Sequence, residues 1–204
     1  MANTCYTTYK IFDKEASIKI RDIVSKTFSE QHGVFMGDVL DALNIPKEDI
    51  DCRGEIVGTS FSADEGLILY CETAWTELTG WRHAIESALD TKIYYIAEEP
   101  GMGYFVYNNP SEEDIFRVEY EISDDDADRL DIYPQDNHEF TNTKELLSFV
   151  EKLTGYSAQC DKKTAFEEQL YSQAQLLAEK ANDKFDEEDN GYYINVDKYE
   201  YIDN

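Results

Sequence analysis

The residues whose types best suit chemistry lie in the middle of the chain, where carboxylates occur close to large aromatic side chains. Glu72, Glu98 and Glu99 each lie at the end of a segment that is predicted to form a strand. If neighbouring strands bring these positions together, the three carboxylates would form an acid/base or metal-binding cluster. Carboxylates fall near one another by chance in a chain this acidic, so spacing alone does not assign catalysis to them.

Two tryptophans flank the loop that leads into the next predicted helix. Trp75 and Trp81, with Tyr94 nearby, would line a shallow aromatic pocket beside the carboxylates. The alternative is structural, because Trp81 begins a helical apolar stripe and Trp75 would cap the same core from the loop. The resulting candidate for an aromatic and acidic pocket comprises Trp75, Trp81, Glu72, Tyr94, Glu98 and Glu99.

An acidic segment near the C-terminus has the outline of a calcium-binding loop. Acids or an amide stand at loop positions 1, 3, 5 and 12, and Gly191 stands at position 6. Position 3 is a glutamate where a shorter side chain is usual, and the aspartate at position 12 reaches less far for a bidentate contact. The alternative is an acidic loop with an Asn-Gly turn that precedes a final strand. The candidate metal ligands are Asp186, Glu188, Asn190 and Asp197.

Signatures of the common enzyme classes do not occur in the sequence. The three histidines are scattered, no cysteine has a histidine close by in sequence, and no phosphate loop, GxGxxG, GxSxG or HExxH motif is present. The four cysteines, at positions 5, 52, 71 and 160, have neither zinc-ligand nor disulfide-framework spacing and indicate reduced thiols. We therefore assign no catalytic residue, expect no cofactor apart from the calcium alternative, and favour a non-enzymatic protein.

Composition excludes several partner classes. The 204 residues include 44 Asp and Glu against 18 Lys and Arg, a net charge of −26. Such a charge repels phosphate backbones and anionic lipid, which argues against direct nucleic-acid or membrane binding. An apolar content of 42% and an aromatic content of 13% are too high for a disordered acidic chain. Without an export signal or an apolar run of spanning length, the expected location is the cytoplasm.

The first half of the chain alternates strands and helices. A strand over 4–12 ends at Asp13, which is expected to cap a helix, and residues 54–60 and 66–73 are predicted to pair as a hairpin. The next helix begins at Trp81 and turns Arg82, Glu86 and Asp90 outward by its periodicity, and strands follow at 92–97 and 103–107. This order is typical of a ferredoxin-like split βαβ arrangement.

The second half is more acidic, with 26 acids and 9 bases after Pro110 against 18 and 9 before it. A strand is expected over 115–122, a helix between Asn142 and Gly155, and a final strand over 192–202. A longer helix over 163–184 is predicted to bury Phe166, Leu170, Ala174, Leu177 and Ala181. We expect residues 1–110 to form a ferredoxin-like core, and residues 111–204 an acidic α+β elaboration packed on it rather than an independent domain.

Three segments in the first half resemble a known family. They are Ala2-Asn3-Thr4-Cys5, Glu72-Thr73-Ala74-Trp75, and the run from Tyr94 to Tyr104, Tyr-Tyr-Ile-Ala-Glu-Glu-Pro-Gly-Met-Gly-Tyr. Together they are similar to the YubB ferredoxin-like family, small proteins carried by bacterial plasmids, phages and other mobile elements. The resemblance implies a ferredoxin-like core with an antiparallel sheet and no particular activity. Together with the elements expected from the residue patterns, the expected fold class is α+β, with this core elaborated by extra strands and C-terminal helices.

These observations leave three functional hypotheses. The first is a non-enzymatic accessory protein of a bacterial mobile element that binds another protein, one with a basic surface. The second is an acidic DNA mimic that blocks a host DNA-binding protein, because duplex DNA presents roughly one charge per 1.7 Å of its axis and so a similar total over a body of this size. The third is a metal-dependent enzyme built on the carboxylates described above.

Overall fold

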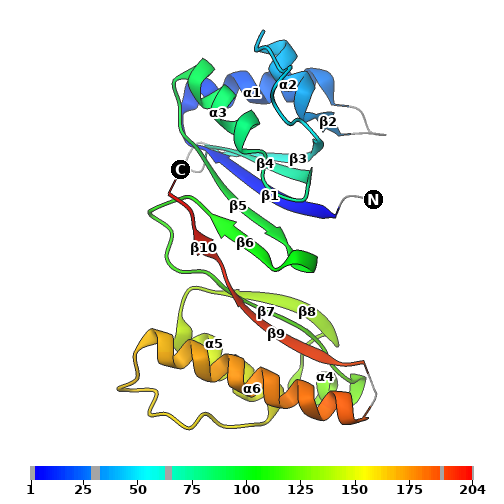
Figure 1. The fold of residues 1–204 in the computed structure, drawn as a ribbon, viewed down its shortest axis with the longest axis vertical. Coiled ribbons are helices and arrows are strands. Elements are labelled where there is room, and N and C mark those ends of the chain that lie inside the picture. Colours follow the sequence, from blue (N-terminus) through cyan, green and yellow to red (C-terminus); the bar gives the residue numbers. More distant parts are fainter. Residues whose placement is uncertain (1–2, 29–32, 63–65, 189–190, 204) are drawn as a thin grey trace. The chain divides into compact units, whose positions relative to one another are not determined.

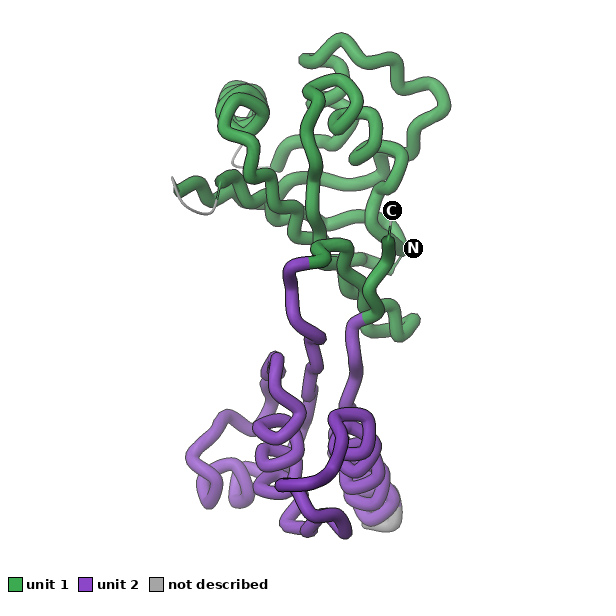
Figure 2. The backbone as a smooth tube through the Cα atoms, turned by 90° about the vertical axis from the view of Figure 1, so that its left-hand side faces the viewer, with its two compact units in different colours: residues 1–110, 200–204 green, residues 111–199 purple. Residues whose placement is uncertain are grey.

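The chain folds into two compact units, each with its own hydrophobic core (Figure 2). The computed structural model describes residues 3–28, 33–62, 66–188 and 191–203. Unit 1 comprises Met1–Pro110 together with Glu200–Asn204, and unit 2 comprises Ser111–Tyr199. The chain therefore passes between the units twice, once after Pro110 and once after Tyr199.

Unit 1 is built around a central strand, β1 (Thr4–Ile11), which pairs antiparallel with β4 (Gly66–Ala74) on one side and β5 (Ile93–Glu99) on the other. Strand β3 (Gly54–Ser62) continues the sheet beyond β4. The resulting order β5-β1-β4-β3, with one helix after β1 and another after β4, is the ferredoxin-like split βαβ arrangement. The predicted fold class is confirmed.

Additional strands extend this core at both edges. The short strand β2 (Val34–Phe35) pairs with β3, and β6 (Tyr104–Tyr107) pairs with β5. Strand β10 (Glu200–Tyr201) pairs parallel with β6 and completes a seven-stranded sheet in the order β10-β6-β5-β1-β4-β3-β2. A short 3₁₀ turn, η1 (Pro100–Met102), connects β5 and β6.

Three helices cover one face of this sheet (Figure 1): α1 (Lys14–Thr27), α2 (Met36–Ala42) and α3 (Thr79–Leu89). Asp13 caps α1 as expected, because its Oδ1 accepts a 2.8 Å hydrogen bond from the backbone N–H of Ala16. The apolar faces of the helices pack against the alternate residues of β1, β4 and β5 that point toward them.

The outward orientation expected for Arg82 and Glu86 is wrong. The Arg82 side chain is fully buried, within 3.4 Å of Glu77 and 3.3 Å of Glu86, and its guanidinium lies 5.1 Å from the centre of the Tyr95 ring. Helical periodicity predicted exposure because a charged residue normally avoids a core. The tertiary structure brings two carboxylates and an aromatic face to the same place, which makes burial of the charge tolerable.

Hydrogen bonds connect this ion pair to the sheet. Tyr9 of β1 donates to Glu77 at 3.3 Å and accepts from the backbone N–H of Leu78 at 3.0 Å, and Thr79 donates to Glu77 at 2.5 Å. Burial, followed by the charge of Glu77, raises the pKa of Tyr9, so its phenol stays protonated as a donor. The loop between β4 and α3 is thereby fixed to the central strand.

Unit 2 is a three-stranded antiparallel sheet in which β7 (Phe116–Glu121) lies between β8 (Gln135–Phe140) and β9 (Tyr193–Lys198). Helices α5 (Thr143–Thr154) and α6 (Glu167–Glu188) cover one face of this sheet (Figure 1). The alternate residues Phe116, Val118 and Tyr120 of β7 are buried in the core of the unit together with both helices.

Three features of unit 2 differ from the sequence-based expectation. The acidic run after the first strand forms helix α4 (Asp124–Leu130), because the Ser123 side chain accepts from the N–H of Asp126 and the helix dipole favours acids in the first turn. Strand β8 was not predicted, since its residues are largely polar. The final predicted strand is divided at Tyr199, and β9 and β10 belong to different sheets.

Among the helices of the described segments, none has both the length and the apolar character of a membrane span.

Replacing Arg82 tests the buried network. Arg82→Ala leaves Glu77 and Glu86 without their cation, and we expect the free energy of unfolding of unit 1 to fall by roughly 3 to 5 kcal/mol. Both tryptophans lie in unit 1, so urea unfolding followed by tryptophan fluorescence reports on this unit. Arg129→Ala, which removes an exposed ion pair with Asp126 in unit 2, is the control and should leave this transition unchanged. A loss below about 1 kcal/mol for Arg82→Ala would show that the network is not required.

Candidate functional site

The three central glutamates do not converge. Glu72 and Glu98 lie on the face of the unit 1 sheet opposite the helices, on either side of Tyr6, which pairs with both of them in register. Glu99 points to the helical face, is only 4% exposed, and accepts a 3.1 Å hydrogen bond from the N–H of Gly101. Adjacent residues of a strand point to opposite faces, so Glu98 and Glu99 are separated by the sheet itself.

The aromatic members of the predicted pocket also lie apart. Trp81 is fully buried and donates from Nε1 to the carbonyl oxygen of Met36 at 2.8 Å, so its expected role as a core anchor is confirmed. Trp75 is 40% exposed in a left-handed backbone conformation, with a φ of 72°. Tyr94 packs against Phe12, with ring centres 5.6 Å apart. The structure therefore places Trp81 in the core and leaves no single aromatic pocket among these residues.

The ends of the calcium-like segment are held apart by helix α6. Asp186 lies in the last turns of α6, whereas the side chain of Gln175 donates to the carbonyl oxygen of Val196, beside Asp197. Gln175 precedes Asp186 by eleven residues, which corresponds to roughly 16 Å along a helix. Asn190 and the side chain of Glu188 lie outside the described residues. Within the described part of the chain, no group of three His, Cys, Asp or Glu side chains is arranged to hold a metal ion.

Asp197 instead faces a buried arginine. It pairs in register with Arg117 of β7, whose guanidinium contacts Glu119 at 2.7 Å. Burial, reinforced by the nearby charge of Glu119 and opposed by that of Arg117, raises the pKa of Asp197. Asp197 is therefore a half-buried carboxylate that interacts with charged neighbours in the sheet, rather than a free metal ligand.

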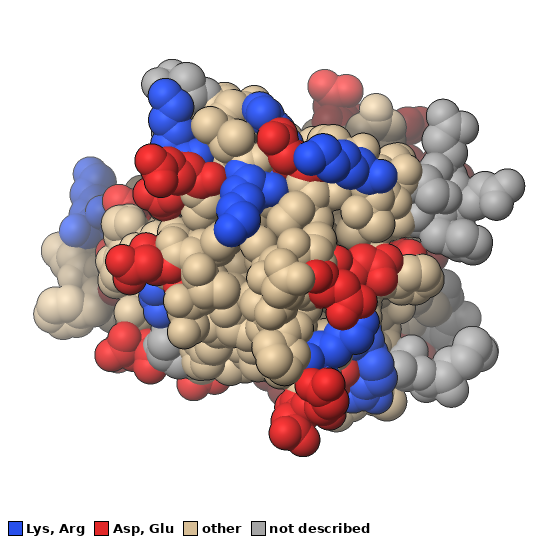
Figure 3. Space-filling view, turned by 90° about the horizontal axis from the view of Figure 1, so that it is seen from above, with Lys and Arg blue, Asp and Glu red and all other residues tan. Residues whose placement is uncertain are grey.

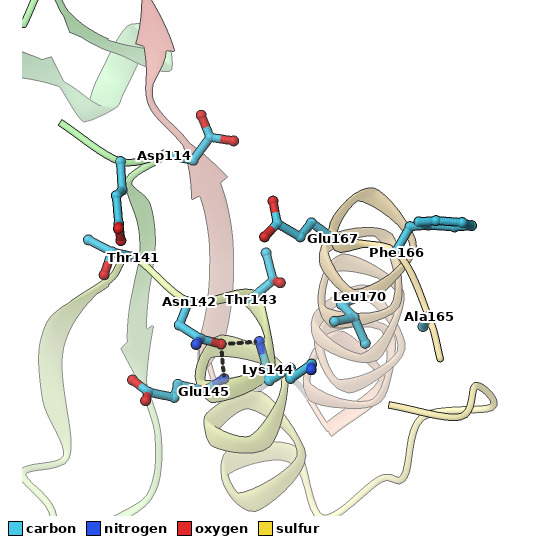
Figure 4. A pocket seen from close by; sticks show the side chains of 11 residues that line it. Asp114, Thr141, Asn142, Thr143, Lys144, Glu145, Ala165, Phe166, Glu167 and Leu170 are labelled. Carbon is cyan, nitrogen blue, oxygen red and sulfur yellow. Dashed lines mark hydrogen bonds between the residues drawn. The ribbon is translucent and has the colours of Figure 1, made fainter. Parts of the chain in front are cut away.

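One cavity of unit 2 forms a groove between the starts of its two long helices (Figure 4). Its volume is about 830 Å³, within the range of known ligand sites. Both helices and the segment that leads into β7 contribute to its walls. The lining residues are Glu113, Asp114, Thr141, Asn142, Thr143, Lys144, Glu145, Ala165, Phe166, Glu167 and Leu170. We call this cavity the acidic groove.

Local sequence explains one wall of the acidic groove. Asn142 caps α5, and its Oδ1 accepts from the backbone N–H groups of Lys144 at 2.9 Å and Glu145 at 3.4 Å. Thr143 follows as the first residue of the helix and is only 4% exposed, yet its side chain lies at the cavity (Figure 4). The described residues provide no hydrogen-bond partner for its hydroxyl. A polar atom is therefore available at the base of the groove.

The opposite wall begins at α6. Glu167 extends from the first turn of α6 toward the side of the groove where Asp114 lies, whereas Phe166 points away from Asp114 (Figure 4). Phe166 is 83% exposed. Its predicted burial on the helical stripe is wrong, because Asp161 forms a separate turn with hydrogen bonds to Lys163 and Thr164 and the helix begins only at Glu167.

A second cavity of about 450 Å³ adjoins the acidic groove and shares Asp114 and Glu167 with it. Phe116 and Tyr171 form its apolar part, with ring centres 5.3 Å apart. Lys198 contacts Oδ2 of Asp114 at 2.5 Å. Burial, with a smaller contribution from Asp197, raises the pKa of Tyr171 to about 12, so its hydroxyl is neutral at physiological pH. The two cavities form a continuous acidic surface along the first half of α6.

The charge on this surface is strongly negative. Its carboxylates are Glu113, Asp114, Glu145, Glu167 and Glu168, and its cations are Lys144 and Lys198. Helix α1 of unit 1, in contrast, carries four basic and two acidic residues, and the helical face of that unit shows Lys and Arg beside Asp and Glu (Figure 3). The acidic character of the protein is therefore unevenly distributed, and the groove belongs to its more acidic part.

Sequence reasoning did not find the acidic groove. Its residues come from three separate segments, 113–114, 141–145 and 165–170, and none belongs to a motif. The available signals were the Asn142 cap and the position of Phe166 next to the acidic pair Glu167 and Glu168. These signals locate the starts of two helices but not their proximity, which depends on tertiary packing.

Comparison of the chain with protein-family models, with curated proteins and with solved structures gives no match in any of the three cases. The functional argument therefore depends on the geometry of the site.

The raised pKa of Asp197 predicts a pH-dependent effect on stability. Because the folded protein binds the Asp197 proton more tightly than the unfolded chain does, ionisation of this carboxyl opposes folding at neutral pH. We expect Asp197→Asn to stabilise unit 2 more at pH 7 than at about pH 3, where the carboxyl is protonated in both states. Urea unfolding followed by far-UV circular dichroism measures the difference, and Asp183→Asn on the exposed side of α6 controls for net charge. An equal effect at both pH values would contradict the assignment.

Proposed function

We propose that this protein is a non-enzymatic accessory protein that binds a protein partner with a basic surface, and that the acidic groove of unit 2 is the binding site. The observation that carries the proposal is the composition of this groove. Across this groove and the adjoining cavity, five carboxylates face two lysines, beside an aromatic ring that is 83% exposed. The described residues provide no ion-pair partner for Glu113, Glu145 or Glu167.

Electrostatics favour a cationic partner for this surface. The net charge of −26 attracts basic proteins over a distance of about 8 Å at physiological salt, and local carboxylates then select the docking position. Uncompensated carboxylates that are close together repel one another, so a cation that enters the groove relieves repulsion as well as forming ion pairs. The same charge opposes binding of nucleic acid or anionic lipid.

Phe166 indicates that the ligand also has an apolar part. Covering a large exposed aromatic side chain with a partner lowers the free energy of the system. Aromatic residues are frequent among the residues that dominate binding energy at interfaces. Phe166 precedes α6 and points away from Asp114, so a ligand that contacts both residues must extend over more than one residue. A polypeptide segment with basic and apolar side chains meets both requirements.

Unit 1 supports the wider assignment to mobile elements. Its ferredoxin-like strand order agrees with the fold that the resemblance to the YubB family implies. We propose on this basis that the protein acts in the cytoplasm of a bacterium that carries such an element.

Charge reversal in the groove tests the proposal. We expect the immobilised full-length protein to retain basic proteins from bacterial lysate and the variant Glu113→Lys/Glu167→Lys to lose most of this retention. The matched control is Glu179→Lys/Asp183→Lys, which changes the net charge equally at exposed positions of α6 outside the groove. Quantitative mass spectrometry compares the retained proteins, and each candidate is then purified and its affinity for the three proteins measured.

Equal loss of affinity in both variants would show that general acidity rather than the groove is responsible. If none of the purified proteins bound the wild-type chain, that result would contradict the function itself. Competition by duplex DNA for the same purified partner would support the DNA-mimic hypothesis instead.

A further inference from the structure

We infer that the acidic groove recognises arginine rather than lysine in its partner, an inference that rests on the proposed function. The critical residues are Asp114, Thr143 and Glu167, which come from three different elements and face one cavity (Figure 4). The ligand is a polypeptide segment whose guanidinium group occupies the space between them.

The acceptors of the groove come from three directions. Glu167 approaches from α6, Asp114 from the segment before β7, and Thr143 from the start of α5. A guanidinium carries five N–H donors in a rigid planar fork and can donate to acceptors on different walls at once. An ammonium is a compact charge on a flexible stem and gains less from acceptors that are already spread apart.

Thr143 contributes a neutral acceptor to the groove. Its side chain is largely removed from solvent, since the residue is 4% exposed, and its hydroxyl has no hydrogen-bond partner among the described residues. The hydroxyl oxygen still reaches the groove, where a ligand can donate a hydrogen bond to it. A donor held between Asp114 and Glu167 would satisfy it, and a planar group that already spans the two carboxylates has further N–H donors for this purpose.

Asp114 retains acceptor capacity for a ligand. Lys198 contacts its Oδ2, which leaves Oδ1 for a second donor. The guanidinium is also more weakly hydrated than an ammonium, so it loses less when it enters a partly enclosed groove. Lys198 therefore does not have to be displaced when arginine binds.

Two labelled peptides test the inference on the full-length protein. Fluorescein-labelled hexa-arginine and hexa-lysine have equal length and charge, and fluorescence anisotropy at about 150 mM salt measures their affinities. We expect the arginine peptide to bind about tenfold more tightly. Glu167→Gln should weaken its binding roughly five- to tenfold, and the control Glu179→Gln on the same helix less than twofold.

Thr143→Val removes the hydroxyl and keeps the shape of the side chain. We expect it to reduce the preference for arginine over lysine to about threefold or less, with an unchanged thermal transition as the control for folding. Equal affinity for the two peptides, with equal weakening of both by Glu167→Gln, would overturn the inference and leave the proposed function in place. An arginine preference that neither substitution lowers would also overturn it. Absence of binding by both peptides would contradict the proposed function as well.

Discussion

The buried charge of Arg82 is the interaction on which unit 1 depends. It joins α3 to the loop that follows β4 through Glu77, and Tyr9 continues the connection into the central strand. A guanidinium without solvent requires carboxylates and an aromatic surface around it, so the loop, the helix and β1 must occupy one relative arrangement for the charge to be tolerated. The ferredoxin-like order of strands supplies this arrangement, because β1 lies between β4 and β5 and faces α3.

Unit 2 presents the opposite electrostatic condition. In unit 1 carboxylates surround an arginine of the same chain, whereas in the acidic groove they surround a space. The two lysines at the groove and its adjoining cavity compensate only part of this charge, and Thr143 adds a hydroxyl that reaches the groove. In unit 1, buried carboxylates pair with an arginine of the same chain. In the groove of unit 2, carboxylates remain available to pair with the cations of a partner. This contrast supports a binding function for the groove.

Local signals account for the elements that sequence analysis located correctly. Asp13 and Asn142 cap their helices as expected, Gly155 ends α5 in a left-handed conformation, and the strands of the two hairpins lie within a few residues of their predicted positions. These features depend on hydrogen bonds and backbone preferences between residues that are close in sequence. The failures have a different character. Arg82 was placed on the exposed side of α3, and Phe166 on the buried stripe of a helix that in fact begins one residue after it, because periodicity describes an average preference and the surroundings of a residue come from distant segments.

The sequence by itself determined the class of the fold, the excess of negative charge and its concentration after Pro110, since these follow from composition and from local patterns. Only the tertiary structure decided which carboxylates share a surface. Strand alternation separated Glu98 from Glu99, the long helix α6 separated Asp186 from Asp197, and packing of α5 beside α6 brought Thr143 to Glu167. The physical reason is that a binding site consists of contacts between residues remote in sequence, and burial of the apolar faces of helices and sheets determines these contacts rather than the charged residues themselves.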